Sequence, residues 1–118
     1  MDEQNKINYV EFPAFDIVAT KHFFETVFKW SFENFGPDYA AFTGQGINGG
    51  FYRSESKSLT SNGAALIVIY SHELAFTQAK VEQAGGLIVK QIFNFPGGRR
   101  FQFIEPSGNE LAVWSDRD

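Results

Sequence analysis

Side chains that can do chemistry recur at alternate positions of several β-like segments. Glu11 and Glu110 occupy such positions, and Arg100 and Gln102 share a third segment. Because side chains alternate between the two faces of a strand, each segment directs its set to one face of a sheet. A carboxylate with a raised pKa can transfer protons, and an arginine fork can hold a carboxylate or phosphate. The pattern therefore predicts acid–base chemistry, with Glu11 and Glu110 as catalytic residues, or anion binding.

Aromatic side chains occupy positions of the same kind and could stack on a planar ligand. The predicted ligand-binding residues are Tyr9, Tyr70, Arg100, Gln102 and Trp114. An alternative stays open for the whole set. The carboxylates can instead be solvated or paired with Arg100, and the aromatic rings can simply fill the space between the strands.

The elements that would position these residues follow one order in the first half of the chain. Alternation predicts a strand over residues 7–12, and apolar residues at helical spacing predict a helix after Asp16, which is suited to cap its first turn. Three short strands are expected around residues 30–35, 39–43 and 50–53.

The second half repeats this order after a polar linker at residues 54–63. A strand over 65–70 precedes a helix that begins at Ser71 or His72, runs to about Ala84 and ends at Gly85-Gly86. Three strands are then expected at 87–93, 99–105 and 110–115. Placing Asp16 over Glu73 superposes the two halves at an offset of 57 residues.

Two tandem βαβββ modules, at about 5–53 and 64–116, predict an α+β fold that forms one domain over residues 1–118. In this fold a curved mixed sheet surrounds a cleft, because the helices cover one sheet face and leave the other open. A ferredoxin-like βαββαβ sandwich is the competing layout. It needs only four strands, whereas the sequence contains eight candidate strands.

Composition excludes several classes of protein. The 118 residues include no Cys, which excludes disulfides, thiolate metal sites and cysteine nucleophiles. A net charge of -4 without a basic cluster argues against a nucleic-acid partner. No apolar run approaches the length of a membrane span, so we expect a cytoplasmic protein. His22 and His72 fall on the predicted helices, where solvated or capping roles are expected.

Two segments carry a family resemblance. Residues 16–30, DIVATKHFFETVFKW, and residues 105–114, EPSGNELAVW, together with the duplicated topology, resemble the vicinal oxygen chelate superfamily. This superfamily contains glyoxalase I, bleomycin-resistance proteins, fosfomycin-resistance proteins and extradiol dioxygenases. The resemblance implies the tandem βαβββ fold and a homodimer in which the partner chain often completes the cleft.

The resemblance also implies where a divalent metal would be held. The four ligand positions of the metal-using members fall on Tyr9, Gly50, Leu66 and Ala112, and none is a first-choice ligand. We therefore expect no metal cofactor. A residual metal site built on Glu11, Glu110 and Tyr9 is an alternative.

The expected function is the binding of a small, anionic, partly aromatic or apolar metabolite or drug, as in bleomycin-resistance proteins. The alternative is an enzyme resembling lactoylglutathione lyase, or an isomerase. It would use Glu11 or Glu110 as a general base, or a metal held by other ligands. A third interpretation is a structural or partner-binding domain whose cleft is closed by Trp114 and Tyr9.

Overall fold

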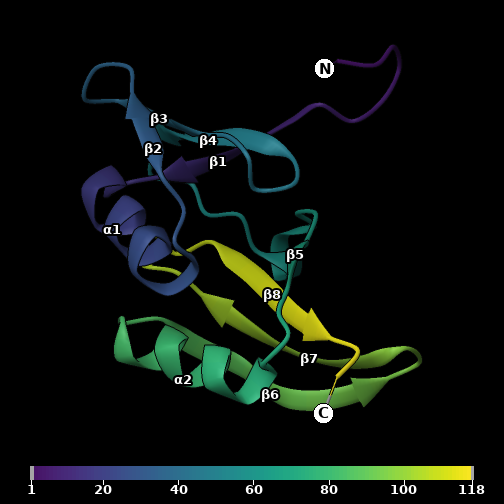
Figure 1. Ribbon diagram of the computed structural model, residues 1–118. Helices are drawn as coiled ribbons and strands as arrows, with labels where there is room; N and C mark the ends of the chain where they lie inside the picture. The colour runs from purple at the N-terminus through teal and green to yellow at the C-terminus, as the bar shows by residue number, and fades with distance from the viewer. Residues whose placement is uncertain (1, 118) are drawn as a thin grey trace.

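The computed structural model describes residues 2–117, which form two four-stranded mixed sheets and two α-helices (Figure 1). Sheet A has the strand order β1-β4-β3-β2, and sheet B has the order β5-β8-β7-β6. The first half contains β1 (Tyr9–Ala14), α1 (Ile17–Phe28), β2 (Phe32–Asn34), β3 (Tyr39–Phe42) and β4 (Asn48–Arg53). The second half contains β5 (Ile67–Tyr70), α2 (Leu74–Gln83), β6 (Leu87–Phe95), β7 (Gly98–Ile104) and β8 (Glu110–Ser115). The predicted βαβββ repeat is confirmed.

Strand β1 is an edge strand that pairs with β4 in parallel, and β5 pairs with β8 in the same way. The expected strand ended at residue 12, but β1 continues through Pro13 to Ala14. An edge strand tolerates proline because one side of its backbone has no ladder hydrogen bonds to donate.

Among residues 2–117, no helix is long and apolar enough to cross a membrane.

Helix α1 starts where its sequence predicts. The Asp16 carboxylate accepts a hydrogen bond from the Ala19 N–H at 3.0 Å, which satisfies a free donor of the first turn. Helix α2 has no side-chain cap of this kind at Glu73. Gly85 follows it with a φ of 96°, a left-handed conformation that glycine adopts without strain.

The core is built largely from phenylalanine rings that α1 shares with both sheets. The ring centroid of Phe24 lies 5.5 Å from that of Phe51 on β4, and that of Phe23 lies 5.7 Å from Phe103 on β7. Helix α2 contributes the buried Leu74 and Val81. Figure 1 shows α1 between sheet A and sheet B, with α2 lying along sheet B. One apolar core therefore joins the two modules.

A buried polar cluster also joins the modules, and we call it the Glu105 cluster: Thr20, Glu105, Ser107 and Asn109. The Thr20 hydroxyl donates to Glu105 Oε1 at 2.8 Å, and the Asn109 amide donates to Glu105 Oε2 at 2.6 Å. The same amide also donates to the Pro13 carbonyl oxygen at 2.6 Å. Burial raises the pKa of the Glu105 carboxyl, although the hydrogen bonds that it accepts act in the opposite direction. The cluster fixes the β7–β8 turn to the end of β1 and the start of α1.

Candidate ligand-binding site

Tyr9, Glu11 and Tyr39 form a hydrogen-bonded group on the face of sheet A that points away from α1. The Tyr9 and Tyr39 phenol oxygens lie 2.6 Å apart, and Tyr39 donates to Glu11 Oε2 at 2.9 Å. Burial, followed by the hydrogen bonds with Tyr9 and Glu11, raises the pKa of Tyr39 above its ordinary value. The Tyr39 phenol is therefore harder to deprotonate than an ordinary tyrosine and serves here as a hydrogen-bond donor to Glu11.

Tyr39 is the residue of this face that the sequence analysis missed. It lies over Gly50, where the resemblance placed the second metal ligand, and a Cβ atom at residue 50 would collide with the Tyr39 ring and phenol oxygen. The structure thus fills this ligand position with a phenol from β3. The sequence does carry a signal for this contact. Tyr39 is a bulky aromatic residue two positions before Ala41, on the same face of β3, and Ala41 pairs with Gly50.

Replacing Gly50 by alanine is expected to lower the free energy of unfolding by about 1–3 kcal/mol, because the added methyl group overpacks the contact with Tyr39. In a Tyr39→Ala background the same substitution should cost much less, since the obstructing ring is gone. Urea unfolding of the wild type, both single variants and the double variant measures this coupling. Equal costs in the two backgrounds would contradict it.

On sheet B, a row of side chains crosses the face that points away from α2. The strand register places Tyr70, Trp114, Arg100 and Phe93 next to one another on four neighbouring strands. The guanidinium carbon of Arg100 lies 5.2 Å from the Phe93 ring centroid and 5.7 Å from that of Phe95. Such contacts hold an arginine by cation–π attraction.

These side chains border a cavity of about 230 Å³, lined by Val68, Phe95, Arg100 and Trp114, which we call the Arg100 groove. The Trp114 ring contacts Tyr70 edge-on with 5.1 Å between centroids, and Phe95 lies 6.2 Å away on its other side. The Nε atoms of Arg100 and of its neighbour Arg99 are both buried without a hydrogen-bond acceptor in the described part of the chain, and Arg100 is the one that lines the groove. The groove therefore presents an aromatic wall and an arginine with unused hydrogen-bonding capacity.

Glu110 lies on the same face, where its carboxylate holds the linker. Oε1 accepts hydrogen bonds from the Thr60 N–H and hydroxyl, both at 2.8 Å, and Oε2 accepts from the Gln102 amide at 2.8 Å. Burial raises the pKa of Glu110, but these hydrogen bonds and the Lys90 charge outweigh it and leave the pKa lowered. Glu110 thus lacks the raised pKa that would suit it to proton transfer. Its catalytic role stays a prediction, as does that of Glu11.

The sequence profile of the Glyoxalase/Bleomycin resistance protein/Dioxygenase superfamily matches residues 6–113. The chain belongs to this superfamily. None of the curated protein sequences matches it. Among solved structures, a glyoxalase-related enzyme from Fulvimarina pelagi is 13% identical, with a TM-score of 0.79 over 94% of this chain and 88% of that one. A lactoylglutathione lyase from Agrobacterium tumefaciens is 16% identical, with a TM-score of 0.71 over 97% and 96%. At these identities the likeness shows the fold alone.

The residues of this glyoxalase-superfamily chain do not fit the metal that the superfamily implies. Residues 2–117 contain no group of three or more His, Cys, Asp or Glu side chains placed to hold a metal ion. Glu11 and Glu110, the carboxylates of the alternative metal site, belong to different sheets and have different hydrogen-bond partners. The described side chains therefore do not offer a divalent metal a suitable ligand set.

The predicted site residues of this superfamily member fall into two sets within one chain. Arg100, Trp114 and Tyr70 come together on sheet B, with Gln102 beside them. Tyr9 and Glu11 lie on sheet A, with Tyr39. Tyr9 is 44% exposed and Tyr70 is 41% exposed, so neither ring is packed away in the core. The two histidines, His22 and His72, are exposed, on α1 and just before α2.

Proposed function

We propose that this superfamily member binds a small anionic molecule with a planar apolar part in the Arg100 groove, without a metal. The observation that supports the proposal is the arginine itself. Its guanidinium is fixed over two phenylalanine rings, with Nε buried and lacking an acceptor. A buried donor without an acceptor is costly, and a carboxylate or phosphate would supply the missing oxygen atoms.

Charge and shape on sheet B favour the same ligand. The Lys90 ammonium lies 5.8 Å from the Phe93 ring centroid, so this ring has two cations near it. Two carboxylates lie near the groove and both already accept hydrogen bonds: Glu110 through both oxygen atoms, and Asp116 from the Tyr70 hydroxyl. A volume of about 230 Å³ accommodates an anionic group and an adjacent ring, and the rest of a larger ligand would extend past Val68 and Tyr70.

Replacing Arg100 by glutamine is expected to weaken the binding of phenyl phosphate and benzoate by about 10- to 100-fold, because charge-assisted hydrogen bonds contribute roughly 1.5–3 kcal/mol. Quenching of Trp114 fluorescence in a Trp30→Phe background measures the affinity. Arg99→Gln is the matched control, because it removes the same charge from the neighbouring position on the opposite face of β7. Equal affinities of the Arg100 and Arg99 variants would refute the proposal.

Two further predictions are tested separately from the groove. If Glu11 or Glu110 is a general base, its change to glutamine should abolish turnover of a substrate while ligand affinity is retained.

The homodimer that the superfamily resemblance implies is measured by light scattering of the purified protein. In such a dimer, a second copy would cover exposed aromatic residues such as Tyr9 and Tyr70.

A further inference from the structure

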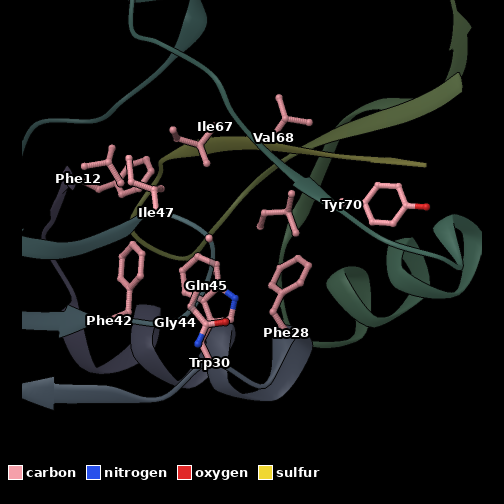
Figure 2. Close-up of a pocket in the computed structure, with 13 residues that line it drawn as sticks. Phe12, Phe28, Trp30, Phe42, Gly44, Gln45, Ile47, Ile67, Val68 and Tyr70 are labelled. Carbon is pink, nitrogen blue, oxygen red and sulfur yellow. The ribbon is translucent and has the colours of Figure 1, made fainter. Parts of the chain in front are cut away.

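A larger cavity, of about 540 Å³, lies between the two modules, and we call it the inter-module pocket (Figure 2). Phe28 and Trp30, at the end of α1, form one wall, and the edge strands β1 and β5 contribute Phe12 and Ile67. The β3–β4 turn, residues 43–47, closes it with Ile47. Its walls include core-facing side chains, since Val10, Phe28, Trp30, Ile67 and Ile69 pack against the buried core. It therefore differs from the Arg100 groove, although Val68 borders both.

In each half of the fold, the turn before the last strand faces the first strand of the other half, and we call this place a junction. The pocket exists because the two junctions are closed differently. The β7–β8 turn is tied to β1 and α1 by the Glu105 cluster, in which Thr20 bonds Glu105. The corresponding residue of the second half is Thr77, whose hydroxyl pairs with Ser71 at 2.8 Å instead of reaching a turn. The β3–β4 turn contains Gly44 and Gly46, both with positive φ, and supplies no buried carboxylate. The junction beside β5 is consequently left open.

The lining of the pocket selects the charge of a ligand. Its walls are almost entirely aliphatic and aromatic, and Tyr70 is the single titratable side chain among the residues that line it. The Tyr70 hydroxyl donates to Asp116 at 2.5 Å, which raises the pKa of the phenol. An ion in this pocket would lose its hydration without gaining a counter-charge. Gln45 and the backbone of the glycines beside it offer polar groups at one side only.

We infer that the inter-module pocket is a second ligand site, which takes a neutral and largely apolar molecule. A cavity of about 540 Å³ lies within the range of small-molecule sites, roughly 300–1,000 Å³. Occupancy would remove the half-buried rings of Phe28 and Trp30 from water, and the transfer of apolar surface drives binding. This site and the Arg100 groove thus differ in the charge of the ligand that each accepts.

The two tryptophans allow each site to be followed on its own, because Trp30 lines the inter-module pocket and Trp114 lines the Arg100 groove. The probe is the neutral dye N-phenyl-1-naphthylamine, titrated into the full chain carrying Trp114→Phe. We expect saturable binding of one dye per chain, with energy transfer from Trp30. Absence of saturable binding would overturn the inference.

A variant that fills the pocket with a larger side chain tests whether the dye binds there. Ile47→Phe places a larger ring into the pocket from a turn outside the strands, and we expect it to weaken dye binding at least tenfold. Leu66→Phe, next to Ile67 but absent from the lining, is the matched control and should leave the affinity unchanged. Thermal unfolding of both variants verifies that they fold. Equal dye affinities for the two folded variants would contradict the inference.

Arg100→Gln separates this site from the proposed function. It should lose phenyl phosphate binding and keep the dye, because Arg100 does not line the inter-module pocket. If Arg100→Gln instead lost the dye, or if phenyl phosphate displaced the dye competitively, the two ligands would share one site and the inference would fail. Retention of phenyl phosphate binding by Arg100→Gln would refute the proposed function alone.

Discussion

Replacing Glu105 by alanine is expected to lower the free energy of unfolding by about 3–5 kcal/mol, the cost of breaking a buried polar network from one side. The carboxylate is 2% exposed and accepts hydrogen bonds from Thr20, Ser107 and Asn109. Without it these three donors lose an acceptor in the interior. Guanidinium unfolding followed by circular dichroism measures the change.

Glu105→Gln is the matched control, because the amide keeps the volume and one acceptor oxygen, and we expect it to cost less than the alanine variant. It also tests the pH dependence. Since the folded pKa of Glu105 is raised, its contribution to stability falls as the pH rises from about 4.3, the ordinary pKa of glutamate, through the raised value. Glutamine at position 105 should remove this decrease. A wild-type stability for Glu105→Ala would show that the cluster does not hold the modules together.

Phe24→Ala is the second substitution with a large expected effect, about 3–5 kcal/mol of lost stability, from the lost burial and the cavity left behind. Phe24 is 0% exposed, and its ring stacks on Trp30 with 4.7 Å between centroids. Trp30 should therefore become more mobile, and its emission should shift to longer wavelength. Urea unfolding measures the loss of stability.

Phe76→Ala is the control for the loss of a phenylalanine in a helix, because Phe76 on α2 is 61% exposed. Its cost should stay within about 0.5 kcal/mol, as is usual for surface substitutions. If the two variants lost equal stability, the core assigned to α1 would be wrong.

The order of the elements could be predicted from the sequence because it depends on local signals. Asp16 caps α1 through an atom three residues away, and Gly85 ends α2 through its own backbone angle. Strand alternation assigned Arg100 and Trp114 to inward-facing positions of their strands, and the pairing of β7 with β8 through a short turn sets the two residues opposite each other. In each case the residues concerned lie within about 15 positions of one another in the chain.

The relative placement of the two sheets could not be predicted in this way. Alternation assigns Glu11 and Arg100 to a face, but it does not say whether two faces meet, which depends on packing between distant segments. The Glu105 cluster joins residues more than 80 positions apart, and the Tyr39 ring fills space above Gly50 from another strand. The inter-module pocket follows from the same distant contacts.

The unequal closure of the two junctions has a consequence for how this chain can change over evolutionary time. The β7–β8 turn is held by buried hydrogen bonds, so most substitutions there would be removed by selection for a folded protein. The β3–β4 turn forms no such buried hydrogen bonds among the described residues, and Gln45 and Ile47 can vary there with little cost to the fold. Of two turns that hold equivalent places in the βαβββ repeat, one thus maintains the structure, and the other can change without that constraint.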